Sequence, residues 1–173
     1  MFPPSCLAAA RRLLDACTAR GIRLATAESC TAGLVAGCLT EHAGSSAVVD
    51  RGWVVYDNAA KRELLGVSAE TLTHFGAVSE RCARELAAGA LERSGCALAL
   101  AVTGIAGPGG GTAEKPVGLV HLVAARRDGP LLHRRHLFPG DRSAVRLASV
   151  EAVLTLALEA LESGPGGPAA GLA

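Results

Sequence analysis

The sequence predicts an α/β fold, a three-layer α/β/α sandwich around a mixed sheet of about five strands. Apolar runs of strand length alternate along the chain with longer segments whose apolar residues recur at helical spacing. The run at residues 97–102 is apolar throughout, as in a strand that helices cover on both faces. The pair Asp128-Gly129 separates two apolar runs and indicates a hairpin, so part of the sheet is antiparallel.

The first third of the chain begins with an expected helix at residues 5–20, whose leucines form one apolar face. An apolar run at residues 22–27 predicts the first strand, and residues 31–39 are compatible with a helix directly after it. Past a loop at residues 42–46, the run at residues 48–56 predicts the second strand.

Capping residues mark the later helices. Asp57 or Asn58 is expected to cap a short helix, which Gly66 ends because glycine accepts the left-handed conformation. Ser68 opens another short turn or helix, and Ser79 is expected to cap a long one. The helices are therefore expected at residues 59–65, 80–94 and from Asp141 to about Glu162, and the remaining strands at 97–102, 118–125 and 131–138.

Length and composition indicate one domain. A chain of 173 residues suits a single hydrophobic core, and neither an internal repeat nor a linker is visible. We expect that domain at residues 1–163 and a flexible tail at 164–173, which is rich in Gly, Pro and Ala.

The charge balance argues against several classes of partner. The 17 basic and 16 acidic residues leave a net charge of +1, without the basic runs and interleaved aromatics of a nucleic-acid-binding protein. No apolar stretch reaches the roughly 20 residues that span a bilayer, and the N-terminus lacks the regions of a signal peptide. We therefore expect a cytoplasmic protein that binds neither nucleic acid nor membrane.

Neither a metal nor another cofactor is expected. The six cysteines form no C-x-x-C pair, and except for Cys30 we interpret them as small buried side chains in apolar patterns. His133 and His136 lie three residues apart on an expected strand, so they point to opposite faces and do not share a metal.

The most informative segment is T-A-E-S-C-T-A-G at residues 26–33, which predicts a strand, a sharp turn that carries Ser29, and a helix. Free backbone N–H groups at such a helix start favour an anion or a developing oxyanion. Ser29 is then either a helix cap or a nucleophile, depending on whether a base reaches it. Cys30 is a rival nucleophile, because helix N-termini stabilise thiolates.

Lys61 is the candidate base. A lysine acts as a base only when neutral, and bringing its pKa near 7 requires a shift of about 3 units, on the order of 4 kcal/mol. Burial supplies such a shift, and a place near the first turn of the helix that Asp57 or Asn58 caps also favours the neutral amine. The alternative is an ordinary surface lysine.

Two further features suit an anionic substrate. The glycine-rich loop at residues 104–111 follows a buried strand and resembles loops that hold phosphate with backbone N–H groups, although a plain surface loop has the same composition. Thr103 and Gly104 lie at the strand end that faces ligands in α/β sheets. Arg142 and Arg146 lie one turn apart and either share a phosphate or form a solvated face beside Asp141.

Six motifs in order resemble the CinA C-terminal domain family, which includes the nicotinamide mononucleotide deamidases. The resemblance runs from about residue 6 to 162. The motifs are residues 26–33, Gly44-Ser45-Ser46, residues 56–61 with Leu65-Gly66-Val67, residues 76–80, residues 103–112 and Lys115-Pro116-Val117-Gly118. Two departures are a single methyl at Ala32, where many relatives have glycine, and the lack of the N-terminal pyrophosphatase-type domain of the larger proteins, which implies the stand-alone form.

The resemblance implies an α/β/α sandwich and a homodimer. It also implies hydrolysis of the carboxamide of nicotinamide mononucleotide to nicotinate mononucleotide and ammonia, in pyridine nucleotide salvage. It assigns Ser29 and Lys61 as a catalytic dyad. The expected substrate-binding residues are Cys30, Thr31, Ala32, Gly33, Ser46, Tyr56, Asn58, Thr103, Gly104, Arg142 and Arg146.

Two other classes of function stay open. The same pocket suits a module that binds a nucleotide or a partner without catalysis, and the dyad suits an amidase for another small carboxamide. A cysteine amidase that uses Cys30 is a third reading.

Overall fold

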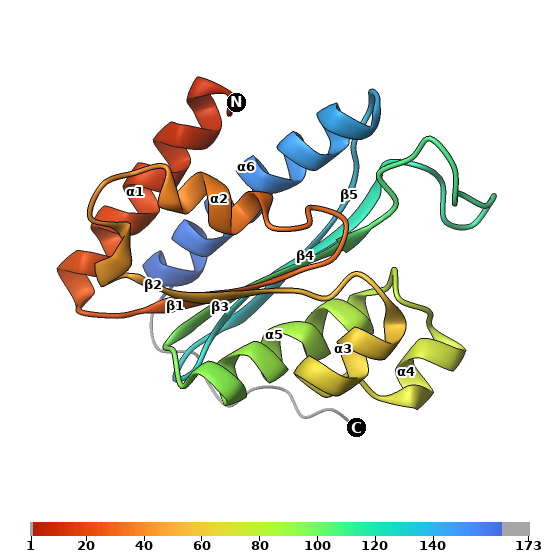
Figure 1. The fold of residues 1–173 in the computed structure, drawn as a ribbon, viewed down its shortest axis with the longest axis horizontal. Coiled ribbons are helices and arrows are strands. Elements are labelled where there is room, and N and C mark those ends of the chain that lie inside the picture. Colours follow the sequence, from red (N-terminus) through yellow and green to blue (C-terminus); the bar gives the residue numbers. More distant parts are fainter. Residues whose placement is uncertain (1, 164–173) are drawn as a thin grey trace.

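A computed structural model describes residues 2–163 (Figure 1). Its helices are α1 (Pro4–Arg20), α2 (Leu34–Thr40), α3 (Asn58–Leu65), α4 (Ala69–His74), α5 (Glu80–Ser94) and α6 (Arg142–Glu162), with a 3₁₀ turn η1 (Ser45–Ala47). Its strands are β1 (Leu24–Glu28), β2 (Val49–Val54), β3 (Leu98–Gly104), β4 (Leu119–Arg126) and β5 (Leu131–Leu137). The expected tail at residues 164–173 lies outside the described residues.

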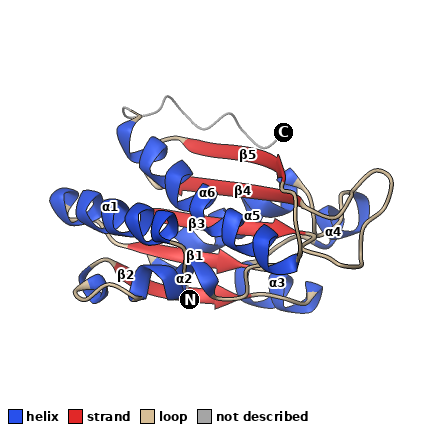
Figure 2. Ribbon diagram, turned by 90° about the horizontal axis from the view of Figure 1, so that it is seen from above, coloured by secondary structure: helices blue, strands red, loops and turns tan. Residues whose placement is uncertain are grey.

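The five strands form one mixed sheet in the order β2-β1-β3-β4-β5 (Figure 2). Strand β1 is parallel to both β2 and β3, whereas β3 pairs antiparallel with β4, and β4 with β5. The carboxyl ends of the three parallel strands therefore meet at one edge of the sheet. The predicted fold class and the hairpin between β4 and β5 are confirmed.

Helices cover both faces of the sheet (Figure 1). Helices α1, α2 and α6 lie on one face, and α3, α4 and α5 lie on the other. In β3, Leu98, Leu100 and Val102 belong to the first core cluster, while Ala99 and Ala101 belong to the second. This alternation explains why the run is apolar throughout, since both faces of the strand are buried.

The predicted caps are confirmed at three helices. Asp57 accepts a hydrogen bond from Ala59 N at the start of α3, Ser79 accepts one from Cys82 N at the start of α5, and Asp141 accepts one from Ala144 N at the start of α6. Gly66 ends α3 with a φ of 72°, the left-handed conformation that glycine adopts without strain.

The expected helix start directly after Ser29 is wrong. Residues 30–33 form a turn, and α2 begins only at Leu34. Ala32 and Gly33 have φ angles of 49° and 92°, which a right-handed helix does not contain. The physical reason is Glu28, whose carboxylate accepts hydrogen bonds from Gly33 N, Val35 N and Ala36 N and so holds the first helical amides itself.

Two kinds of feature are absent from residues 2–163. None of their helices combines the length and the apolar character that a membrane crossing requires. His, Cys, Asp and Glu side chains in the same residues nowhere gather in a group of three or more that suits a metal ion.

Candidate active site

One cavity of about 260 Å³ lies at the carboxyl ends of the parallel strands. Ser29 follows β1, Tyr56 follows β2, and Thr103 and Gly104 end β3, so the sheet topology brings these distant segments together. This is the edge at which open α/β sheets bind ligands. The residues that both the sequence and the cavity assign to the site are Ser29, Cys30, Tyr56, Asn58, Lys61, Thr103, Gly104 and Arg142.

Lys61 is not a surface lysine. It lies in the first turn of α3 with a relative exposure of 1%, and it is the largest of the fully buried side chains. Its Nζ donates hydrogen bonds to Val55 O at 2.9 Å and to Tyr56 O at 2.8 Å. Among the described residues, no carboxylate forms an ion pair with it.

These surroundings favour the neutral amine of Lys61. Burial lowers the pKa of Lys61 from its ordinary value, because desolvation disfavours the ammonium form. A neutral amine has two hydrogens, which match the two carbonyl acceptors, and one lone pair, which is left for a proton from another group. The first turn of a helix adds a positive dipole end that opposes a cation. Lys61 therefore has the environment of a general base.

Ser29 is not a helix cap. Gly33 holds the N-cap position of α2, and the first amides of that helix donate to the Glu28 carboxylate and not to Ser29. Ser29 N donates to Val102 O at 2.9 Å, which fixes its backbone to β3. Within residues 2–163, the Ser29 hydroxyl has no hydrogen-bond partner, and it lines the same cavity as Lys61. The hydroxyl is thus free to meet a substrate in the cavity that it shares with Lys61.

Cys30 is a poor candidate for the nucleophile. Burial is the main cause that raises its pKa to about 11, so the thiol stays protonated at neutral pH. The helix N-terminus that was expected to stabilise a thiolate is held by Glu28 instead. Cys30 nevertheless lines the cavity.

Arg142 lies at the rim of the cavity and is exposed. Its guanidinium donates to Gly107 O at 2.9 Å and to the Tyr56 hydroxyl at 3.2 Å. It therefore connects the glycine-rich loop to the segment that leads into α3, and it presents a cation beside backbone groups of Gly109 and Gly110.

The structure does not bring Arg146 to the cavity. Its guanidinium donates to Cys30 O at 3.0 Å and to Thr31 O at 2.9 Å, so its donors face the turn after Ser29. The expectation that Arg142 and Arg146 share one anion is wrong, because the two guanidinium groups have separate backbone partners.

Four other residues expected at the site also lie outside its lining. Thr31 is fully buried and the amides of Ala32 and Gly33 are bonded to Ser29 O and to Glu28. Ser46 is exposed in η1, which precedes β2 and lies beside the start of β1 because the two strands are parallel. It is therefore at the opposite edge of the sheet from Ser29.

Sequence reasoning missed part of the lining. Ala77 and Val78 line the cavity, and Thr103 Oγ1 donates to Ala77 O at 2.8 Å, so the hydroxyl of Thr103 holds the segment before α5. It also missed Glu28, which is 1% exposed and accepts four hydrogen bonds beneath the turn. An acidic residue at the end of an apolar strand was the signal available in the sequence.

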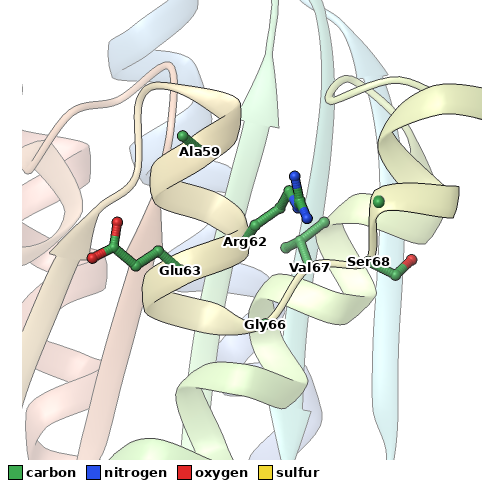
Figure 3. A pocket seen from close by; sticks show the side chains of 7 residues that line it. Ala59, Arg62, Glu63, Gly66, Val67 and Ser68 are labelled. Atoms are coloured by element: carbon green, nitrogen blue, oxygen red, sulfur yellow. The ribbon is translucent and has the colours of Figure 1, made fainter.

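A second hollow of about 530 Å³ lies against α3 and carries no such chemistry (Figure 3). It is lined by exposed residues of α3 and the following turn and by the buried Val67, and it contains neither Ser29 nor Lys61. Arg62 points from the helix toward Val67, whereas Glu63 extends from the other side of the helix (Figure 3). Ser29 and Lys61 thus line the cavity at the strand ends and not this hollow.

Known proteins resemble this chain over most of its length. The nicotinamide-nucleotide amidohydrolase PncC of Enterobacter agglomerans is 53% identical over 140 residues, which are 81% of this chain and 85% of that protein. The CinA-like protein of Mycolicibacterium gilvum is 54% identical over 144 residues, or 83% of this chain, but this chain spans only 34% of that longer protein.

A solved structure supports the same relationship. The competence/damage inducible protein CihA from Agrobacterium tumefaciens superimposes with a TM-score of 0.91 at 55% identity, covering 94% of this chain and 99% of that one. The family model of the CinA C-terminal domain matches residues 7–161. The chain therefore belongs to the CinA C-terminal domain family.

Proposed function

We propose that the protein is an amidohydrolase that converts nicotinamide mononucleotide to nicotinate mononucleotide and ammonia, with Ser29 and Lys61 as its catalytic dyad. The observation that carries the proposal is the buried amine of Lys61 in the cavity that also holds the unbonded hydroxyl of Ser29. The substrate is taken from the PncC relative, whose name states this activity.

The first half of the reaction forms an acyl-enzyme. The neutral amine of Lys61 accepts the proton of Ser29, whose Oγ attacks the carboxamide carbon. The resulting oxyanion collapses, the C–N bond breaks, and Lys61 returns the proton to the leaving ammonia. Nicotinate mononucleotide is then held as an ester on Ser29.

The second half releases the acid. Water attacks the ester carbon while Lys61 accepts one of its protons, and the bond from the carbon to Ser29 Oγ breaks. Lys61 returns the proton to Oγ, and the free hydroxyl and the neutral amine are restored. The balance is amide plus water to carboxylic acid plus ammonia.

Two backbone amides are the candidate donors to the oxyanion. Within residues 2–163, Cys30 N and Thr31 N have no hydrogen bond to another residue, whereas Ala32 N is bonded to Ser29 O. We assign the oxyanion to the Cys30 N–H, because Cys30 lines the cavity next to the nucleophile, whereas Thr31 is fully buried outside the lining.

The ribose and phosphate fit the rim of the cavity. Arg142 and the glycine-rich loop supply a guanidinium and backbone N–H groups, which are suitable partners for a phosphate. Tyr56 and Asn58 line the same cavity as Lys61, and the Tyr56 hydroxyl accepts a hydrogen bond from Arg142, so these two residues are the candidates to orient the pyridine ring or the ribose.

The test is ammonia release from nicotinamide mononucleotide by the wild type and three variants. We expect Ser29→Ala and Lys61→Ala to lose at least about 10³-fold in kcat, and Cys30→Ala to keep most of its activity. Activity that survives in Ser29→Ala but not in Cys30→Ala would replace the serine mechanism by a cysteine mechanism.

The same experiment separates the other functions. Nicotinamide riboside, which lacks the phosphate, is expected to be a much poorer substrate, because it offers no anion to Arg142 and the glycine-rich loop. Equal activity with both compounds would favour an amidase for another small carboxamide. A wild type that binds the mononucleotide without releasing ammonia would favour a nucleotide-sensing or partner-binding module.

We also infer where and in what form the protein acts. It takes part in pyridine nucleotide salvage in the cytoplasm as a homodimer, each chain of which forms a single domain at residues 1–163. Exposed apolar side chains at Val54 and Leu64, on the sheet edge and the adjoining helix, support self-association. Analytical ultracentrifugation tests it, and a monomer at micromolar concentration would contradict the dimer.

A further inference from the structure

Arg146 binds the main chain of the turn that carries the nucleophile. From the second turn of α6, its Nε donates to Cys30 O at 3.0 Å and its Nη2 donates to Thr31 O at 2.9 Å. These carbonyls belong to the first two residues after Ser29, at the start of the turn. Two parallel donors on adjacent carbonyls fix the orientation of both peptide planes.

The orientation of a carbonyl determines the orientation of an amide. In a trans peptide the C=O of one residue and the N–H of the next point in opposite directions. Because Arg146 holds Cys30 O toward α6, the N–H of Thr31 points away from α6. Within the described residues, neither this N–H nor that of Cys30 has a partner in another residue. Thr31 is fully buried outside the cavity lining, so the N–H beside the cavity is that of Cys30, in the peptide before the one that Arg146 holds.

Glu28 fixes the other end of the same turn. Its two carboxylate oxygens accept hydrogen bonds from Gly33 N at 2.9 Å, Val35 N at 3.0 Å and Ala36 N at 2.9 Å. The amides after the turn are thereby used, while the amides of Cys30 and Thr31 are left without partners. The turn is held between an anion that binds its N–H groups and a cation that binds its carbonyls.

We propose that Arg146 is a positioning residue that holds the Cys30–Thr31 peptide, and with it the turn, so that the Cys30 N–H, whose residue lines the cavity, donates to the oxyanion formed on Ser29. This inference rests on the proposed acyl transfer through Ser29, and it gives Arg146 a role other than the binding of the substrate phosphate. Without the guanidinium, this peptide is free to rotate and the donor is lost for part of the time.

The test compares Arg146→Gln and Arg146→Lys with the wild type and with a matched control. Arg127 is the control, because it also donates to two main-chain carbonyls, those of Cys96 and Leu91, but at the other end of the sheet. For each protein the melting temperature is measured, together with kcat and KM for nicotinamide mononucleotide.

We expect Arg146→Gln to lower kcat by about 10- to 100-fold, which is less than the complete loss of an oxyanion donor, and to change KM by less than about threefold. Arg146→Lys, whose single amine reaches only one carbonyl, is expected to have a kcat between those of the wild type and Arg146→Gln. Arg127→Gln is expected to keep the wild-type kcat. A rise in KM at constant kcat in Arg146→Gln would overturn the proposal and indicate a substrate contact. An equal fall in kcat in Arg127→Gln would also overturn it, because the effect would then come from a general loss of stability.

A second readout does not need the nucleotide. A small fluorophosphonate reacts with an activated serine, as Oγ attacks phosphorus, fluoride leaves, and the phosphoryl oxygen occupies the oxyanion position. Its rate of labelling at Ser29, followed by mass spectrometry, is expected to fall in Arg146→Lys and Arg146→Gln in the same order as kcat.

The labelling distinguishes the two proposals. A wild type that is labelled but releases no ammonia from the mononucleotide would refute nicotinamide mononucleotide as the substrate. The labelling rates of the wild type and the Arg146 variants would still decide the role of Arg146. Equal labelling rates in the wild type and both Arg146 variants would overturn the positioning role, even if the amidohydrolase activity is present.

Discussion

At the residue scale, Lys61 combines two properties that oppose each other. A buried ammonium group is unfavourable, yet the two carbonyls of Val55 and Tyr56 bind the amine through its hydrogens. Desolvation lowers the pKa of Lys61, whereas in the unfolded chain its pKa returns to the ordinary value near 10.4. At neutral pH the unfolded chain therefore binds the proton of this amine more readily than the folded protein does.

This difference predicts a pH dependence of stability. As the pH rises toward 10, the folded protein loses the Lys61 proton before the unfolded chain does, so the wild type gains stability relative to Lys61→Met. Urea unfolding of both proteins at pH 7 and pH 9 measures the change in their difference. Comparing the two proteins removes the titration of the buried cysteines, which is common to both. A difference that stays constant, or that moves in favour of Lys61→Met, would contradict the lowered pKa.

Ala32 carries strain in the turn after the nucleophile. It is exposed, and its φ of 49° lies in the left-handed region, where a Cβ costs roughly 1–2 kcal/mol. Glycine removes that cost but loses more entropy on folding, so we expect Ala32→Gly to raise the free energy of unfolding by about 0.5–1 kcal/mol. Thermal or urea unfolding tests it, and a destabilised variant would show that the methyl makes a contact worth more than the strain.

At the element scale, the start of α2 depends on Glu28. Four donors converge on its carboxylate, one from Thr26 Oγ1 and three from the backbone. In Glu28→Gln an amide nitrogen replaces one acceptor and leaves buried donors unpaired, so we expect a loss of about 2–4 kcal/mol of unfolding free energy. Urea unfolding measures it, with Glu41→Gln at the exposed end of the same helix as the control. A loss below 1 kcal/mol would mean that water replaces the missing acceptor.

The error in the expected helix start has the same origin. The residues after Ser29 fit a helix by composition, but composition does not show where a side chain from the preceding strand points. Glu28 alternates with Ala27 on β1 and turns back onto the amides of residues 33–36, which moves the helix start to Leu34. By contrast, the caps Asp57, Ser79 and Asp141 were predictable because each acts on amides two or three residues away.

The packing of α3 against α5 depends on Gly89. A Cβ at this position would lie 2.0 Å from Leu65 O, so Gly89→Ala must push apart the helix that carries Lys61 and the helix beneath it. We expect a loss of about 1–3 kcal/mol of stability and a fall in kcat. Gly37→Ala is the matched control, because an added Cβ there meets nothing closer than Phe2 at 3.6 Å, and it is expected to gain about 0.5–1 kcal/mol from helix propensity. Melting temperatures that move in the same direction would contradict the close contact.

At the scale of the whole molecule, strand order decides which predicted residues meet. The motifs around Ser29, Lys61 and Thr103 were recognisable in the sequence, and the parallel order β2-β1-β3 places their strand ends together. Ser46 belonged to an equally clear motif but precedes its strand, which puts it at the other edge. The sequence suggested Arg146 as a second phosphate ligand, because helical spacing places Arg142 and Arg146 on one face of the helix. That spacing does not show which residues Arg146 contacts.

Strand register also creates a histidine pair that the sequence did not reveal. His121 on β4 and His133 on β5 join through Nδ1 and Nε2 at 3.0 Å with stacked rings, and Glu80 from α5 lies 3.4 Å from Nδ1 of His133. In the sequence, the nearest histidine to His133 is His136 on the same strand, and spacing along one strand does not show a neighbour on another. Across the hairpin, His133 pairs with Val123. His121 lies two residues before Val123 and therefore on the same face of the sheet, diagonally next to His133. No local sequence pattern specifies this register.

This pair predicts how the stability of the whole molecule falls in acid. Burial is the largest cause that lowers the pKa of His121 to about 4, with His133 and Arg135 acting in the same direction, whereas an unfolded histidine titrates near 6.5. Above pH 6.5 both states are neutral at this position, and His121 contributes its full share of stability. As the pH falls from 6.5 toward 4, only the unfolded chain takes up the proton, which removes on the order of 3 kcal/mol of unfolding free energy.

The measurement is urea unfolding of the wild type and His121→Gln between pH 7 and pH 4.5. The glutamine has no proton to bind in this range, so its unfolding free energy is expected to fall less steeply with decreasing pH, and the two curves converge in acid. Because the carboxylates titrate in both proteins, only the difference between the curves reports His121. Parallel curves would mean that His121 takes up its proton equally well in the folded protein, and the His121–His133 contact would then have to open without cost to the sheet.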